Sequence, residues 1–151
     1  MPPLNRVFRS IALLACVLCA PAALARDSIV YLDMSEVVAD ARASGKLDGS
    51  VDFYLSGQPL PEIETRLGEG VTNRKTNAFN KSDAEACRWV LMSALIVLQE
   101  GAKKRGADAV VDVVSYYKKR IYTDPAKVEC HAGAVVAGIA LKGTFVKQRG
   151  H

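Results

Sequence analysis

The sequence predicts an α+β domain, in which one dominant helix packs on an antiparallel or mixed sheet of about five strands, preceded by a small N-terminal strand and helix. Three observations predict this class. Residues 83–105 place apolar side chains at helical spacing, and several shorter segments are β-branched or alternate with a period of two. Turn residues separate these segments, and no repeat or linker divides the chain. The length of 151 residues therefore predicts one domain, residues 26–151, after a targeting segment, residues 1–25.

The targeting segment has the three parts of a secretory signal peptide. Arg6 and Arg9 form a positive start, residues 11–24 are almost wholly apolar, and residues 23–25 read Ala-Leu-Ala, the small-x-small form that signal peptidase accepts. The apolar run is shorter than the roughly 20 residues that span a bilayer. We therefore expect an exported, periplasmic protein with no membrane span after cleavage. A short membrane anchor, a buried N-terminal helix and a lipidated N-terminus at Cys16 are the alternatives.

Cleavage after Ala25 changes the charge and the cysteine content. It removes two arginines and no acid, which leaves 18 basic against 16 acidic residues, a net charge of +2. This near-neutral balance argues against a nucleic-acid partner. Cys16 and Cys19 have the spacing of a redox pair but leave with the signal segment.

Cys87 and Cys130 remain after cleavage, and an oxidising compartment favours a disulfide between them. Such a bridge closes a long loop and would stabilise the fold by roughly 4 kcal/mol in the chain-entropy model. Two separate buried thiols are the alternative.

The first half of the domain alternates short strands with one short helix. Residues 28–32 form a strand candidate, and Asp33 with Glu36 has capping-box spacing for a helix that ends by Gly45. Residues 51–55 and 63–67 both alternate and are interpreted as a hairpin, with Val51, Phe53 and Leu55 on one face. Gly68 and Gly70 predict a break or bulge, and a polar segment follows from residue 72 to residue 81.

The long helix has clear signals at both ends. Ser82 with Glu85 forms a capping box, cations occupy the last turn, and Gly106 is the expected left-handed cap. Its apolar surface is wider than one stripe, which predicts deep burial or cover on a second side.

Three more strand candidates follow this helix. They are residues 109–117, 128–132 and 134–146, the middle one with Cys130 facing inward. Because Cys87 lies on the core face of the long helix, a bridge to Cys130 would join that helix to the sheet.

Residues 102–111 read AKKRGADAVV, and the segment from Cys130 to Gly143 closes with AGIALKG. This part of the chain, residues 87–143, resembles two families. One is the Rcs-pathway outer-membrane stress-sensor lipoprotein, and the other is the YbjQ-like group described as heavy-metal binders. The resemblance implies a small α+β fold with a closing strand at its end.

The whole mature chain resembles small exported proteins often labelled excinuclease ATPase subunits, through residues 70–79 (GVTNRKTNAF) and 116–118 (YYK). The residues contradict an ATPase or excinuclease activity. A phosphate-binding loop needs Gly before its Lys-Thr pair, and Arg74 precedes Lys75-Thr76.

Cys87, Cys130 and His131 are weak candidates for a metal site. Zinc or copper needs about four ligands, and adjacent positions send Cys130 and His131 to opposite faces of a strand. A disulfide beside a surface histidine is the favoured interpretation. A free Cys87 near the helix N-terminus, with His131 as its base, would instead be a thiol nucleophile.

Two basic segments are candidate binding sites. The polar segment with Asn73, Arg74, Lys75 and Asn77 runs toward the N-terminus of the long helix and could hold an anion or a cell-wall polymer. A solvated loop, with the helix start already capped by Ser82, is the favoured interpretation. Residues 116–120 (YYKKR) mix aromatics with cations, as single-strand nucleic-acid binders do, but a solvated strand end is the favoured interpretation.

These observations predict a non-enzymatic periplasmic binding or envelope-interaction module without a cofactor. Its ligand or partner would be an envelope protein, a cell-wall polymer or a small molecule, with no nucleic acid. Metal handling is the first alternative function, and a thiol-dependent or other hydrolase is the second.

Overall fold

The computed structural model describes residues 26–150. The predicted signal peptide, the lipidation alternative at Cys16, Cys19 and the terminal His151 lie outside the described residues. Within residues 26–150, no helix is both long and apolar enough to cross a membrane.

The α+β class is confirmed, with six strands and two α-helices in the described part of the chain. The elements are β1 (Ser28–Asp33), α1 (Met34–Ala43), β2 (Asp52–Leu55), β3 (Ile63–Asn77), α2 (Asp83–Lys104), β4 (Ala109–Ser115), a short 3-10 turn η1 (Tyr117–Lys119), β5 (Lys127–Ala132) and β6 (Val136–Gln148). The expected sheet of about five strands is therefore one strand short.

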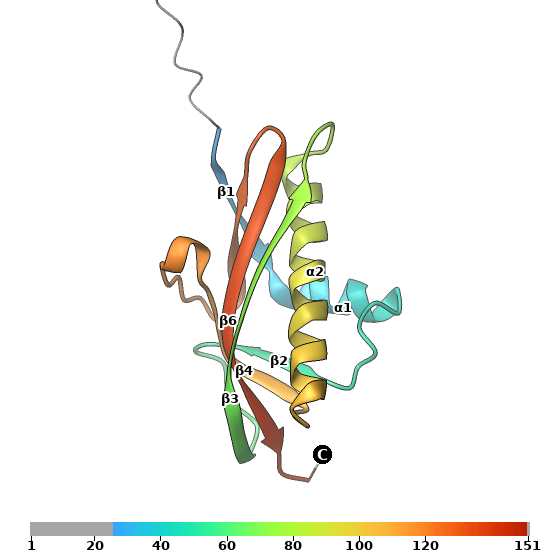
Figure 1. The fold of residues 1–151 in the computed structure, drawn as a ribbon, viewed down its shortest axis with the longest axis vertical. Helices are drawn as coiled ribbons and strands as arrows, with labels where there is room; N and C mark the ends of the chain where they lie inside the picture. Colours follow the sequence, from blue (N-terminus) through green and yellow to red (C-terminus); the bar gives the residue numbers. More distant parts are fainter. Residues whose placement is uncertain (1–25, 151) are drawn as a thin grey trace, which may run out of the picture.

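The sheet is organised around β6 (Figure 1). On one side, β3 pairs antiparallel with almost the whole of β6. On the other side, β5 followed by β1 covers the first part of β6, and β4 followed by β2 covers the second part. Because β2 and β4 are parallel and all other pairs are antiparallel, the sheet is mixed.

The predicted hairpin between residues 51–55 and 63–67 is wrong. β2 pairs in parallel with β4, and the connection then carries the chain to β3 on the opposite side of β6. No hairpin partner receives the backbone N–H of Leu55. This N–H donates instead to Oε1 of Gln58, in the turn that follows β2, over 2.9 Å. Period-two alternation reports which side chains share a face, and it is silent about which strand is the neighbour. The predicted face is confirmed, since Val51 and Leu55 are buried and Phe53 packs against the core.

The polar segment predicted as a solvated loop is mostly strand. β3 continues through the expected bulge near Gly68 (φ +97°) and ends at Asn77. Its backbone groups pair with β6, while its side chains lie at the outer edge of the sheet, where polar residues are tolerated. The sequence pattern alone does not show this, because the paired residues of β6 lie between 59 and 85 positions further along the chain.

The hydrophobic core lies between α2 and one face of the sheet. Ser82 caps α2 as expected, accepting the Glu85 N–H over 3.1 Å, and Gly106 is left-handed (φ +71°). The core-facing residues of α2 include Cys87, Val90, Leu91, Ala94, Leu95, Leu98 and Ala102. They pack on Ala137, Ile139, Leu141 and Phe145 of β6 and their neighbours. The loop that contains η1 lies on the other side of the sheet from α2 (Figure 1).

The predicted bridge between Cys87 and Cys130 is present, with their Cα atoms 5.8 Å apart. Both residues are fully buried. The disulfide therefore joins the first turns of α2 to β5, as the sequence predicts.

Candidate ligand-binding site

The sheet face opposite α2 carries the cluster of polar and aromatic side chains that we consider the candidate site. Strand register identifies which side chains point to this face, because paired residues in an antiparallel ladder share a side. Ile139 faces α2, so Gly138 and Ala140 face away from it, together with their partners Lys75 and Asn73 on β3. His131 is paired with Gly138 and faces the same way.

The loop between β4 and β5 is held across this face by backbone hydrogen bonds. Ser115 and Tyr122 exchange two N–H···O bonds of 3.0 Å that close the base of the loop. The Tyr116 N–H donates to the carbonyl oxygen of Ala140 over 2.8 Å, which attaches the loop to β6. The path of the chain over the sheet is therefore defined by its own backbone.

Two lysines in this loop adopt a conformation that side chains rarely take. Lys118 has φ +51° and Lys119 has φ +62°, both in the left-handed region. Residues other than Gly, Asn and Asp are uncommon there, and such conformations cluster at functional sites. The loop is thus held in an unfavourable local conformation that presents two lysines side by side.

Tyr117 anchors the loop on β5 and β6. Its ring stacks on the His131 imidazole, with centroids 3.8 Å apart and planes 12° from parallel. A Cβ at Gly138 would lie 3.4 Å from Tyr117 Cε2 and 3.7 Å from Lys75 Cγ, so the ring and the lysine stem both lie over this glycine. The absence of a side chain at Gly138 lets them approach the strand closely.

His131 is buried, which corrects the expectation of a surface histidine. Only 4% of the residue is exposed, because Tyr117 covers it. Its Nδ1 lies 3.1 Å from Oδ1 of Asp27, and its Nε2 has no hydrogen-bond partner among the described residues.

A cavity of about 280 Å³ lies beside this loop. Its lining is Val71 and Asn73 from β3, Ala140 from β6, and Tyr116, Lys118 and Lys119 from the loop. We call Asn73, Lys75, Tyr116, Tyr117, Lys118 and Lys119 the Tyr–Lys surface.

The charge of the Tyr–Lys surface is positive. Lys75, Lys118 and Lys119 form no salt bridge within residues 26–150. Lys118 Nζ lies 5.4 Å from the centre of the Tyr117 ring. At its border, Lys142 Nζ lies 3.2 Å from Glu69 Oε1 and 5.8 Å from the centre of the Tyr116 ring.

The structure places the four predicted anion-binding residues on two faces. Asn73, Lys75 and Asn77 share the face of the Tyr–Lys surface, whereas Arg74 points to the face of α2. All four residues are exposed, and Oδ1 of Asn77 accepts the Phe79 N–H over 2.8 Å. The aromatic and basic segment at residues 116–120, analysed separately in the sequence, lies beside Asn73. Only the pairing of β3 with β6 brings these two segments together.

The weak metal and thiol candidates are separated by the sheet. Cys87 and Cys130 are bonded to each other, so neither sulfur is a thiolate in this structure. His131 points to the opposite face of β5. Among residues 26–150, no group of three or more His, Cys, Asp or Glu side chains is arranged to hold a metal ion.

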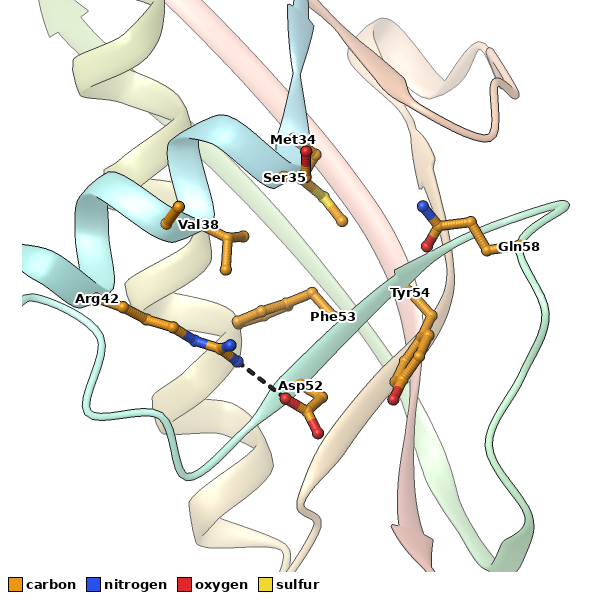
Figure 2. Close-up of a pocket in the computed structure, with 9 residues that line it drawn as sticks. Met34, Ser35, Val38, Arg42, Asp52, Phe53, Tyr54 and Gln58 are labelled. Atoms are coloured by element: carbon orange, nitrogen blue, oxygen red, sulfur yellow. Dashed lines mark hydrogen bonds and ion pairs between the residues drawn. The ribbon is translucent and has the colours of Figure 1, made fainter.

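A second cavity, of about 300 Å³, lies between α1 and β2 (Figure 2). Val38 and Phe53 form its apolar wall, and the guanidinium of Arg42 donates to Oδ1 of Asp52 over 2.9 Å at one end. Burial and the neighbouring Asp52 carboxylate raise the pKa of Tyr54. At the other end, the Gln58 amide donates to the Pro125 carbonyl oxygen and accepts the Leu55 N–H. Because Arg42, Asp52 and Gln58 already bind protein groups, this cleft suits a charged ligand less well than the Tyr–Lys surface.

Comparison of the sequence with protein-family models and with curated proteins gives no match. The family resemblances given above therefore stay predictions.

Proposed function

We propose that this protein is a non-enzymatic periplasmic binding module that holds an acidic glycan of the cell envelope on the Tyr–Lys surface. One observation carries the proposal. Two segments more than 40 residues apart meet here: Asn73 of β3 lines one cavity with Tyr116, Lys118 and Lys119 of the loop after β4. Lys75 and Tyr117 lie beside them, over Gly138.

The side chains of this surface match the chemistry of an acidic sugar. Tyrosine rings offer apolar faces for the C–H groups of a sugar ring, with a polar tip at the edge. Lysine ammonium groups pair with carboxylates or phosphates, and the amide of Asn73 can donate to a hydroxyl and accept from one. An anionic ligand would also be attracted by the positive charges of Lys75, Lys118 and Lys119 before contact.

The rigidity of the loop favours a binding role. Three backbone hydrogen bonds and the Tyr117–His131 stack hold Lys118 and Lys119 in position. Groups that are ordered before binding lose less conformational entropy when the ligand arrives. The left-handed conformations of Lys118 and Lys119 would therefore favour binding, because the two lysines are already ordered before the ligand arrives.

The location of the protein is part of the proposal. The signal-like segment at residues 1–25 and the buried disulfide support export to an oxidising compartment. Acidic glycans and phosphorylated polymers are accessible in that compartment, and most nucleic acids are not.

The test is calorimetric titration of the protein with an oligogalacturonate, and with a maltooligosaccharide of equal length as the neutral control. The double variant Lys118→Asn/Lys119→Asn removes two charges but keeps residues that accept left-handed backbone. Each exposed ion pair contributes up to about 1 kcal/mol, so we expect affinity for the acidic glycan to fall about tenfold. Binding should also weaken as salt is raised.

Lys104→Gln is the matched control, because Lys104 is an exposed lysine in the last turn of α2. It should bind the acidic glycan like the wild type. Equal binding of the two sugars, or equal loss in the control and the double variant, would contradict the proposal. Tighter binding of a single-stranded oligonucleotide than of the glycan would assign the surface to nucleic acid instead.

A further inference from the structure

Two loops form an exposed apolar tip at one end of the molecule. The β3–α2 loop carries Phe79, and the β5–β6 turn carries Val135 immediately before Val136, the first residue of β6 (Figure 1). The exposed fractions are 60% for Phe79, 60% for Val135 and 46% for Val136. We call these three residues the apolar tip. They border a cavity of about 510 Å³ together with Lys75, Thr76 and Asn77.

The apolar tip is held together by the backbone. The Ala78 N–H donates to the carbonyl oxygen of Val135 over 2.7 Å, which joins the two loops. Oδ1 of Asn77 accepts the Phe79 N–H over 2.8 Å, and Asn80 turns the chain with φ +58°. Phe79 is therefore directed outward by a defined turn, although a large exposed aromatic side chain is unfavourable in water.

The described chain begins at the same end of the molecule. A Cβ at Gly133 would lie 3.2 Å from the carbonyl oxygen of Arg26, so Arg26 lies beside the β5–β6 turn. Its guanidinium forms a salt bridge with Asp83, at the start of α2. In the sequence, the apolar residues 11–24 precede Arg26 with one residue between them. Before cleavage, a membrane-bound apolar leader would thus bring this end of the domain to the bilayer surface.

Cations flank the apolar tip. Lys75 and Lys81 form no salt bridge within residues 26–150, and Lys81 Nζ lies 3.2 Å from the carbonyl oxygen of Asn77. Apolar side chains surrounded by lysines match the boundary between acyl chains and anionic head groups. Self-association fits less well, because a two-fold interface through this tip would bring lysines toward their own counterparts.

We propose that the apolar tip docks on the surface of an anionic phospholipid bilayer. Phe79, Val135 and Val136 enter the head-group region, and Lys75 and Lys81 contact lipid phosphates. The contact is interfacial, and it places the Tyr–Lys surface next to the membrane. This inference goes beyond the proposed glycan binding and does not depend on it, although Lys75 borders both surfaces.

The test is co-sedimentation of the exported protein with vesicles of phosphatidylglycerol and phosphatidylethanolamine, compared with vesicles of phosphatidylcholine alone. The variant Phe79→Ser/Val135→Ser should reduce the partition coefficient on anionic vesicles by about tenfold or more, because it removes apolar area from the contact. Val97→Ser is the matched control, since Val97 is an exposed apolar residue of α2. Lys81→Gln should weaken binding to anionic vesicles and leave the low binding to phosphatidylcholine unchanged.

Three results would overturn the docking proposal. They are absence of wild-type binding to anionic vesicles, equal binding of the wild type and Phe79→Ser/Val135→Ser, and equal loss in the Val97→Ser control. A concentration-dependent dimer that this double variant abolishes, without vesicle binding, would assign the tip to a second copy. Titration of the same double variant with oligogalacturonate separates the two proposals, because it leaves the Tyr–Lys surface intact. Retained glycan binding with lost vesicle binding is the expected result.

A second measurement uses fluorescence in a Trp89→Phe background. Phe79→Trp places the only tryptophan of the chain at the tip. Its emission should shift to shorter wavelength when anionic vesicles are added. An unchanged emission maximum would overturn the proposal even if the protein sediments with vesicles.

Discussion

The ring of Tyr117 lies flat on the imidazole of His131, and this stack connects the strained loop to the sheet. The two residues are 14 positions apart in the sequence and belong to different elements, η1 and β5. The stack buries His131 and fixes the residue that immediately precedes Lys118. The burial of His131 and the position of Lys118 therefore depend on the same contact.

Replacing Tyr117 tests this relationship directly. Tyr117→Ala should expose His131 and raise its rate of acylation by diethyl pyrocarbonate, followed by peptide mass spectrometry. The lost ring pair should also lower the free energy of unfolding by about 0.5–1.5 kcal/mol, in addition to the lost burial. Tyr117→Phe keeps the ring and should retain the protection. If His131 reacts at the same rate in the wild type and in Tyr117→Ala, the ring does not cover it in solution.

The close approach of Gly70 to Phe145 predicts a large effect of a small substitution. A Cβ at Gly70 would overlap the Phe145 ring, and one at Gly101 would lie 3.1 Å from its Cζ. Gly70→Ala should therefore destabilise the protein by about 1–3 kcal/mol, measured by urea unfolding.

A double-mutant cycle with Phe145→Leu provides the control for this prediction. Leucine leaves room for the new methyl group, so Gly70→Ala should be less destabilising in that background. Equal effects in the two backgrounds would exclude the overlap as the cause.

Reduction of the Cys87–Cys130 bridge should lower the free energy of unfolding by about 4 kcal/mol in the chain-entropy model, because the closed loop constrains the unfolded chain. The measurement is urea unfolding of the oxidised and the reduced protein at equal pH. Cys87→Ala/Cys130→Ala should resemble the reduced wild type and should not respond to reductant. Unchanged unfolding after complete reduction would show that the bridge does not constrain the unfolded state.

The cap of α1 predicts a dependence of stability on pH. The Asp33 carboxylate accepts hydrogen bonds from the Ser35 hydroxyl and from the backbone N–H groups of Glu36 and Ser35. These bonds, that of the Ser35 hydroxyl most strongly, lower the pKa of Asp33 from 3.8. Because the folded-state pKa is lowered, the carboxylate stabilises the fold above its unfolded pKa. That contribution is lost as the pH falls through the folded pKa.

Asp33→Asn isolates this effect, since asparagine caps a helix but does not titrate in this range. Thermal unfolding of the two proteins between about pH 6 and pH 2 is the measurement. The stability of the wild type relative to Asp33→Asn should decrease below about pH 4. A difference that stays constant across this range would show that Asp33 does not titrate in the folded protein with a lowered pKa.

Much of the local structure is readable in the sequence because its causes are local. Asp33 and Ser82 cap their helices as their spacing predicts, and Gly106 ends α2 in the left-handed conformation. The disulfide is predicted from compartment and from the inward positions of Cys87 and Cys130. The helix caps depend on residues within one turn of each other. The disulfide follows from cysteine chemistry, because two cysteines in an oxidising compartment usually pair.

The candidate site required long-range information. Asn73 and Lys118 lie on one cavity because β3 pairs with β6 and the loop after β4 crosses the same strand. The burial of His131 depends on Tyr117, and the alternation around Cys130 shows only that the histidine faces away from the disulfide. The strain at Lys118 and Lys119 has no sequence signal, since neither residue favours positive φ.

The sequence by itself determined the α+β class, the order of strands and helices, the helix ends and the cysteine pair, because periodicity, capping and residue chemistry act over short distances. Only the tertiary structure decided that β2 pairs with β4 and that β3 continues through a polar segment. It also decided which polar side chains share a face. Strands pair where distant segments can bury apolar side chains together and satisfy their backbone hydrogen bonds. A local sequence pattern does not show which distant segments do so.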